Sequence, residues 1–451
     1  MPLEHFLDKW TKRSPSPSPL PLKGERVAKG RRGEAEPYPE LGEGVAIPLE
    51  VKAARVLSLG MAKAKDERHG MSEAGTKALL PAGLRDLLPP EAAHEARLRE
   101  SLMATLAAHG YERVDPPLVE FEEGLLAGLG AATAADTFRL MDPVSQRMMG
   151  VRADMTPQVA RLATSRLAAS ARPLRLSYAG EVLRVKGSQL RPERQFLQVG
   201  AELIGSASAE ADAEAVLLAA EALAGVGVRQ LSIDLSSPTL VTALAAGHGC
   251  SAAETQRLRA ALDRKDAAEV ARLGGPAAEL AKALLAAAGK AERALDALAR
   301  LTLPPAAGAE AARLAEVAAL VQRAEPELAL TIDPVEYRGF EYQTGVSFTL
   351  FARGVRGELG RGGRYLAGNA PGEPATGFTL FLDSVSRAVP EPAPAKRLFL
   401  PYGTAAALGR KLRAEAWITL AALEPAVDAR AEAKRLGCSH LWLGGQIVAL
   451  D

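Results

Sequence analysis

The sequence predicts an α+β fold in which helices flank a largely antiparallel sheet, with a helical insertion and a small C-terminal α/β module. Short strand-like runs joined by short turns recur between residues 113 and 204 and again between 329 and 382. An Ala/Leu-rich block with helical periodicity separates these two groups, and a tail with two apolar runs follows them. Strands that follow one another across short turns pair in antiparallel fashion, so we expect the main sheet to be mostly antiparallel.

The first group of elements begins with an amphipathic helix and continues with a series of strands. Helices are expected at residues 91–108, 157–169 and 209–225. Strands are expected at residues 113–119, 137–141, 147–152, 174–183, 196–204 and 231–235, with the second and third of these joined by a turn at 142–145.

The second group opens with the helical block, at about 252–324, which Pro276 and the pair Pro304 and Pro305 interrupt. Strands should return at residues 329–332, 345–352, 357–360 and 376–382, and a helix should follow Asp383. In the tail we expect strands at residues 398–401 and 441–443, with helices at 405–414 and 428–436.

These elements divide the chain into three parts. Residues 1–70 are first Pro/Ser-rich and then charged, without a period of 2 or 3.6, which predicts a disordered or misassigned N-terminal extension. Met61 or Met71 would then be the genuine start, and the alternative is a functional disordered arm. Residues 71–390 should form the main domain and 391–451 the small C-terminal module.

Composition excludes several functional classes. The 451 residues are 48% hydrophobic and 24% charged, as in ordinary globular proteins. A net charge of +1 gives no broad attraction to nucleic acid or to an anionic membrane. Cys250 and Cys438 stand far apart, outside any CxxC pattern, so we expect no disulfide framework and no metal site. Because no apolar run is long enough to span a bilayer and no signal peptide is evident, we expect a cytoplasmic protein.

The strand predicted at 196–204 carries the most informative polar pattern. Gln198, Gly200 and Glu202 share one face, because side chains alternate along a strand. An amide and a carboxylate in line, with a glycine between them, leave room for a ligand over the sheet. Burying these groups without partners would cost a few kcal/mol each. The alternative is a half-exposed strand with a solvated face.

Residues 178–186 (YAGEVLRVK) and 194–205 (RQFLQVGAELIG) resemble motif 2 of the class II aminoacyl-tRNA synthetases, in its histidyl-tRNA synthetase form. Other segments resemble the same family in the same order. They are 80–89 (LPAGLRDLLP), 110–117 (GYERVDPP, the dimer-interface motif 1), 151–156 (VRADMT), 337–345 (YRGFEYQTG) and 362–365 (GGRY). The resemblance covers roughly residues 80–388 and implies a class II synthetase-like antiparallel sheet.

The resemblance also implies a histidine pocket. Asp154 and Thr156 would hold the α-ammonium group, and Arg184 would bind the α-carboxylate with its planar guanidinium. The remaining residues that the resemblance implies are Gln198 and Glu202 at the amino group and imidazole, Tyr342 and Tyr365 as walls around the ring, and Arg338, which matches the arginine beside the α-phosphate.

Three positions depart from the synthetase pattern. Lys186 offers donors where the family places a glutamate that reads the adenine amino group. Ser384 stands where an arginine clamps the ATP triphosphate, and losing such a cation costs orders of magnitude in rate. Gln343 replaces the second of two adjacent tyrosines, and its amide can still bond an imidazole.

The tail after residue 388 is too short for the synthetase's anticodon-binding domain and has no basic run. This combination resembles the regulatory subunits of ATP phosphoribosyltransferase. That resemblance implies a non-catalytic chain without a cofactor, dimeric within a hetero-oligomer, whose partner is the short catalytic subunit and whose effector is L-histidine. It implies no binding of tRNA and no membrane. The alternatives are a truncated histidyl-tRNA synthetase, a histidine-activating paralogue, and a scaffold with a vestigial pocket.

Overall fold

The computed structural model describes residues 80–187, 191–337, 342–368, 371–390 and 395–450. The helices and strands described belong to the unit that begins at Asp86. The predictions for residues 1–70, and the expected site residue Arg338, lie outside the described residues.

Within the described residues, nine strands form the main sheet in the order β1-β5-β6-β12-β11-β10-β7-β9-β8. Every neighbouring pair is antiparallel except β1 with β5 and β7 with β9, so the prediction of a largely antiparallel sheet is confirmed. The bounds are β1 Glu112–Arg113, β5 Leu174–Leu183, β6 Gln195–Ile204, β7 Leu231–Ser236, β8 Gly289–Lys290, β9 Ala329–Ile332, β10 Ser347–Ala352, β11 Gly360–Ala367 and β12 Glu373–Phe381.

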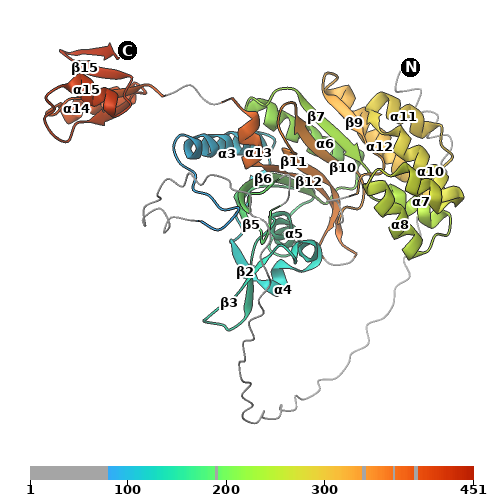
Figure 1. The fold of residues 1–451 in the computed structure, drawn as a ribbon. Coiled ribbons are helices and arrows are strands. Elements are labelled where there is room, and N and C mark those ends of the chain that lie inside the picture. Colours follow the sequence, from blue (N-terminus) through green and yellow to red (C-terminus); the bar gives the residue numbers. More distant parts are fainter. Residues whose placement is uncertain (1–79, 188–190, 338–341, 369–370, 391–394, 451) are drawn as a thin grey trace, which may run out of the picture. The chain divides into compact units, whose positions relative to one another are not determined.

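Helices pack on the sheet through apolar stripes. The helix α3 (Glu91–Ala108), which has the bounds predicted from its periodicity, buries Leu98, Leu102 and Leu106 and packs against β5, β6 and α6. The helix α6 (Ala209–Gly225) also has its predicted bounds. It begins at Ser208, whose side chain accepts a hydrogen bond from the Ala211 amide. Of two shorter helices, α13 (Leu382–Ala388) packs against α3 and β6, whereas α5 (Thr156–Thr164) packs against β6 and β11 from the other face of the sheet (Figure 1).

The predicted helical block is present and breaks at its polar and proline residues. Its helices are α8 Ala252–Asp263, α9 Ala267–Leu273, α10 Gly275–Ala287, α11 Ala291–Ala299 and α12 Pro305–Ala324. The helix α7 Leu240–Gly247, which precedes the block, was not predicted. A capping box of Ser251 and Glu254 starts α8, and Asp266 caps α9. Pro305 occupies the first turn of α12, where its missing N–H costs nothing. In Figure 1 this block lies beside β9, and α12 packs on α6 and α7.

Two smaller sheets accompany the main one. Three strands, β2 Val119–Phe121, β3 Phe138–Met141 and β4 Met148–Val151, form a sheet in the order β2-β4-β3, next to the short helices α4 Glu122–Leu125 and η1 Gly128–Thr133. The tail forms a four-stranded sheet in the order β14-β13-β15-β16. Its elements are β13 Arg397–Leu400, α14 Ala406–Ala414, β14 Ile418–Ala421, α15 Ala429–Arg435, β15 His440–Leu443 and β16 Gln446–Ala449.

The C-terminal module covers both faces of its central strand. Phe399 packs with Leu441 and Ala433 on one face, whereas Leu398 and its neighbour Leu400 pack with Leu412 of α14 on the other. The apolar runs predicted at 398–401 and 441–443 are strands. The short, half-exposed strands β14 and β16 were not predicted.

Some predicted elements were wrong. Residues 357–359 of the strand expected at 357–360 are irregular, and Gly360 is the first residue of the strand β11, which was not predicted. The glycines of β11 argue against a strand, but β10 and β12 on either side supply its hydrogen bonds. The strand expected at 113–119 splits into β1 and β2, since Pro116 and Pro117 cannot donate to a ladder. Among the described residues, no helix is long and apolar enough to cross a membrane.

Candidate functional site

The polar face of β6 lies at the centre of the sheet. The strands β5 and β12 flank β6, and Glu202 stands opposite Leu176 on one side and Gly377 on the other. Gly200 stands opposite Tyr178 and Thr379. Both Gln198 and Glu202 are about 1% exposed, so the solvated-face alternative is wrong and these polar groups have partners inside the protein.

Glycines make room for protein groups at this face. A Cβ on Gly200 would lie 2.3 Å from the Tyr178 hydroxyl, and one on Gly377 would lie 1.9 Å from the Glu202 carboxylate. The room expected above Gly200 is therefore filled by the Tyr178 side chain, which corrects the expectation that a ligand lies there. The reason is tertiary, because Tyr178 reaches this space from the neighbouring strand β5.

Glu202 accepts hydrogen bonds from three hydroxyl groups. Its Oε1 accepts from the Thr156 hydroxyl at 3.0 Å and from the Tyr178 hydroxyl at 3.2 Å, and its Oε2 accepts from the Tyr365 hydroxyl at 2.9 Å. Burial raises the pKa of Glu202 to about 8, although the hydrogen bonds from Tyr365, Thr156 and Tyr178 act in the opposite direction. Burial, together with the Glu202 charge, also raises the pKa values of Tyr178 and Tyr365 well above their ordinary value.

A cavity of about 170 Å³ opens beside this carboxylate, and the sheet forms its floor. Its walls come from the segment before α5, the end of β5, the segment before β10, and the strands β11 and β12. Seven of the nine residues expected from the sequence line it: Asp154, Thr156, Arg184, Glu202, Tyr342, Gln343 and Tyr365.

The two charged ligand-binding candidates stand on different walls. Asp154 precedes α5 and accepts a hydrogen bond from the Thr156 amide at 3.0 Å, which aligns the turn that carries both residues. Arg184 follows β5, donates its Nε to the Ala153 carbonyl at 3.2 Å, and lies 5.2 Å from the Phe196 ring centroid. The cavity thus presents a carboxylate from one segment and a guanidinium from another.

The aromatic and amide candidates form the wall across the cavity. The rings of Tyr342 and Tyr365 meet edge to face, with centroids 6.3 Å apart. Gln343 is 7% exposed and donates its Nε2 to the Gly362 carbonyl at 3.2 Å. Its Oε1 is buried without a hydrogen-bond partner among the described residues. A buried acceptor in a cavity wall is a site where a ligand N–H would recover the lost hydrogen bond.

Gln198 lies outside the lining of the cavity. Its Oε1 accepts a hydrogen bond from the Met155 amide at 3.0 Å, and its side chain is not among those that line the cavity. Gln198 therefore holds the segment between Asp154 and Thr156 from behind the wall.

Arg361 is a cavity residue that the sequence analysis missed. It lies on β11, where Arg361, Gly363 and Tyr365 share a face, and all three line the cavity. Its guanidinium donates to the Glu358 carboxylate at 2.5 Å. Burial lowers the pKa of Arg361, but the charge and hydrogen bond of Glu358, together with the charges of Tyr342 and Asp154, outweigh burial, and the net pKa is raised. Correct placement of β11 would have revealed it through the two-residue alternation.

Ser384 lies among arginines from other segments. Its hydroxyl accepts from Arg191 at 3.3 Å and from Arg387 at 3.0 Å. Arg191 also lies 3.6 Å from the Phe381 ring centroid and 3.4 Å from the Asp383 carboxylate. Position 384 thus has cations close to it, and they are engaged with this chain's own Asp383 and Phe381.

In the part of the chain that the structure describes, no group of three His, Cys, Asp or Glu side chains could hold a metal ion. Both cysteines are free thiols.

Comparisons with known proteins define the class first. The histidyl-tRNA synthetase family matches residues 83–385. A crystal structure from Bacillus halodurans C, described as an ATP phosphoribosyltransferase regulatory subunit/histidyl-tRNA synthetase, superposes with a TM-score of 0.69 at 24% identity, over 79% of this chain and 96% of that one. A histidyl-tRNA synthetase from Nostoc sp. PCC 7120 gives a TM-score of 0.68 at 20% identity, over 81% of this chain and 91% of that one. These two structures show the fold, which is that of the class II synthetases in their histidyl form.

Relatives with higher sequence identity then identify the family within this class. The ATP phosphoribosyltransferase regulatory subunit of Rhodospirillum centenum is 62% identical over 83% of this chain and 97% of its own length. That of Paramagnetospirillum magneticum is 60% identical over 82% of this chain and 97% of its own length. This chain belongs to the family of ATP phosphoribosyltransferase regulatory subunits.

Proposed function

We propose that this chain activates the short catalytic subunit of ATP phosphoribosyltransferase without catalysing a reaction itself, and that histidine bound in its cavity inhibits the complex. The observation that carries the proposal is the cavity itself. It places the carboxyl groups of Asp154 and Glu202, the guanidinium groups of Arg184 and Arg361, two tyrosine rings and one amide oxygen around a space of about 170 Å³. That oxygen, Gln343 Oε1, is buried without a hydrogen-bond partner among the described residues. In this proposal the complex acts in histidine biosynthesis, in the cytoplasm, and the chain dimerises within it.

The chemistry of an α-amino acid with an imidazole fits these groups. Asp154 and the Thr156 hydroxyl would accept from the ammonium group, and Arg184 would bind the carboxylate through charge-assisted hydrogen bonds. Gln343 Oε1 would accept from an imidazole N–H, which would satisfy an acceptor that is otherwise buried alone. For histidine to regulate, it must bind one assembly state more tightly than another, and a difference of about 1–3 kcal/mol gives roughly 5- to 150-fold control.

The decisive experiment measures phosphoribosyl transfer by the short catalytic subunit, with and without this chain, across a histidine titration. Activity should rise when the chain is added and fall as histidine is added. The D154N variant should need about 10- to 100-fold more histidine for the same inhibition, because the ammonium group loses a charged acceptor. The exposed, otherwise matched variant D296N should behave like the wild type.

A different set of results would support the synthetase alternative. Unchanged phosphoribosyl transfer, combined with histidine-dependent ATP–pyrophosphate exchange by the chain alone, would overturn the regulatory proposal.

A further inference from the structure

A second hollow lies on the protein surface, away from the cavity that is proposed to bind histidine. It is a groove of about 960 Å³ between α6, the end of α12 and the segment that follows α12. We call it the α6–α12 groove. Its floor is apolar and consists of alanines together with Leu217, Leu218, Val228, Leu231, Leu320 and Leu328. An apolar depression of this size on an otherwise charged protein surface is the kind of feature that contacts a partner.

The rims of the α6–α12 groove are acidic. Along α6, Glu210, Glu214 and Glu221 recur at spacings of four and seven residues, so they stand on one side of the helix. Across the groove stand Glu325 and Glu327, which are exposed.

Some of this negative charge is already balanced. Arg175 forms two hydrogen bonds with Glu214, and His109 lies 3.1 Å from Glu221. Besides His109, Arg323 is the other basic residue among those that line the groove. The remaining surplus is negative and lies on both rims, so a complementary partner carries positive charge along both edges of an apolar face.

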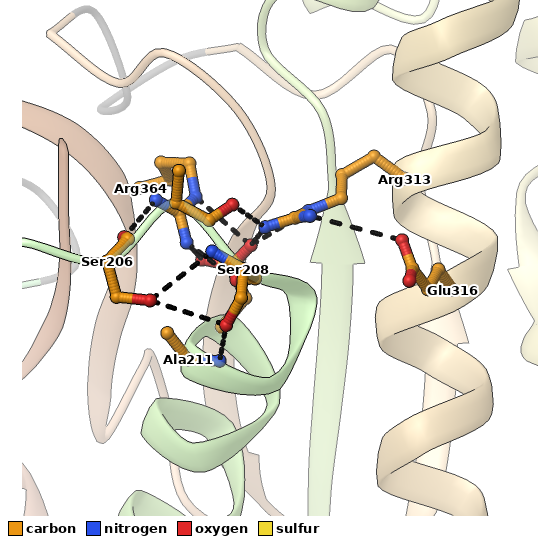
Figure 2. Close-up of polar contacts among 8 residues, drawn as sticks. Ser206, Ser208, Ala211, Arg313, Glu316 and Arg364 are labelled. Atoms are coloured by element: carbon orange, nitrogen blue, oxygen red, sulfur yellow. Dashed lines mark hydrogen bonds and ion pairs between the residues drawn. The ribbon is translucent and has the colours of Figure 1, made fainter. Parts of the chain in front are cut away.

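The groove is also linked to the cavity through one carboxylate. Asp212, on α6, is 2% exposed and accepts hydrogen bonds from two arginines, Arg313 and Arg364. Figure 2 shows these two arginines near Ser206 and Ser208. Arg313 of α12 donates to its Oδ2 at 2.9 Å, and Arg364 of β11 donates to the same atom at 3.1 Å. Arg364 is followed by Tyr365, whose side chain lines the cavity from the opposite face of β11.

These contacts join three elements. The ion pair between Asp212 and Arg313 ties α6 to α12, which are two walls of the groove. The pair between Asp212 and Arg364 ties α6 to a strand of the cavity. A shift of β11 on ligand binding would therefore move the groove walls, which gives the groove a physical route for responding to an effector.

We propose that the α6–α12 groove binds a basic amphipathic helix of the chain that this subunit regulates. The apolar side of that helix lies on the leucine and alanine floor, and its lysine or arginine side chains face the glutamates of the rims. This inference rests on the proposed function, for which it names the contact surface.

The test measures the dissociation constant between the full chain and the short catalytic subunit, by sedimentation velocity at several salt concentrations. Two variants change the groove: L217D places a charge on the floor, and E325K/E327K reverses the charge of one rim. Each should weaken the complex about 10-fold or more, and the salt dependence seen with the wild type should flatten in E325K/E327K.

Matched controls keep the result interpretable. L423D changes a leucine that is 90% exposed outside the groove, and E279K/E292K makes the same charge change on exposed positions of α10 and α11. Both should bind within about 2-fold of the wild type. Histidine affinity, measured by calorimetry, should be unchanged in all four variants. If L217D proves unfolded, the solvent-facing E325K/E327K variant decides.

Several outcomes would overturn the inference. Wild-type affinity in both groove variants would show that the catalytic subunit binds elsewhere, with the proposed function intact. A loss of self-association without any loss of the catalytic subunit would assign the groove to a second copy of this chain. If the wild type itself fails to bind the catalytic subunit, the proposed function fails along with it.

Discussion

At the scale of single residues, Glu202 has the strongest influence on the cavity. It is 1% exposed and accepts hydrogen bonds from the hydroxyl groups of Thr156, Tyr178 and Tyr365. Its carboxylate fits only because Gly377 has no side chain. A carboxylate so placed is costly to ionise, because three hydroxyl donors replace only part of its lost hydration. Its protonation state therefore affects both the stability of the sheet and the hydrogen bonds offered to a ligand.

The first prediction concerns this carboxyl and pH. Its pKa rises from an ordinary 4.5 to about 8 on folding, so the folded protein binds more protons than the unfolded chain between these values. Its contribution to stability is full below pH 4.5 and is lost as pH rises toward 8. The unfolding free energy should thus fall with pH by up to about 1.4 kcal/mol per pH unit from this group.

The E202Q variant tests this linkage, because glutamine keeps the size of the side chain and does not titrate. Urea unfolding at pH 5, 6, 7 and 8 should show E202Q gaining stability relative to the wild type as pH rises. A constant difference between the two proteins across this range would show that Glu202 does not titrate there.

At the scale of elements, the cavity combines strands of the main sheet with the segments that precede α5 and β10, and side-chain bonds hold some of these parts to neighbouring elements. The segment before α5 is fixed from behind by Gln198 of β6, and β11 is fixed to α6 through Arg364. Arg364 also donates to the Ser206 and Ser208 carbonyls, at 2.8 and 2.9 Å, which satisfies the turn that leads into α6 (Figure 2).

The second prediction concerns the carboxylate at this junction. Replacing Asp212 by alanine leaves Arg313 and Arg364 without their shared acceptor, and Arg364 is buried. The unfolding free energy of D212A should fall by about 3–5 kcal/mol, because an uncompensated buried charge remains.

The control is E432A, which breaks an exposed ion pair with Arg435 in the C-terminal module and should leave the unfolding free energy almost unchanged. Thermal and urea unfolding of both variants measure the difference. A loss in D212A no larger than that in E432A would mean that the junction contributes little to stability.

At the scale of the whole molecule, charge is evenly balanced. The chain has 55 basic and 54 acidic residues, and many of its arginines are paired with acids of the chain itself, including Arg175, Arg313 and Arg361. Nucleic-acid binding depends on cations that are free to neutralise phosphates. A class II synthetase fold alone therefore does not imply a tRNA ligand for this chain.

The third prediction follows from this balance. Filter binding with histidine tRNA at 150 mM salt should show no submicromolar complex. Any weak binding should show a shallow dependence on salt concentration, because few counterions are released. A tight complex with a steep salt dependence would contradict this expectation and would favour the truncated synthetase.

The sequence by itself determined much about the elements and the family. The bounds of α3, β5 and α6 follow from periodicity, turn residues and a serine cap, all of which act within a few residues of the element that they define. The family motifs are equally local in the chain. They single out Asp154, Arg184 and Tyr365, which come from different elements and line one cavity.

Only the tertiary structure decided what fills and surrounds that cavity. Tyr178 takes the space above Gly200, and Arg361 enters through the unexpected strand β11. Arg191 meets Ser384 across 193 positions of sequence, and Asp212 joins Arg364 across 152. The physical reason is that these contacts depend on which strands are neighbours, and a strand pairs according to the hydrogen bonds and packing offered by distant segments rather than by its own residues alone.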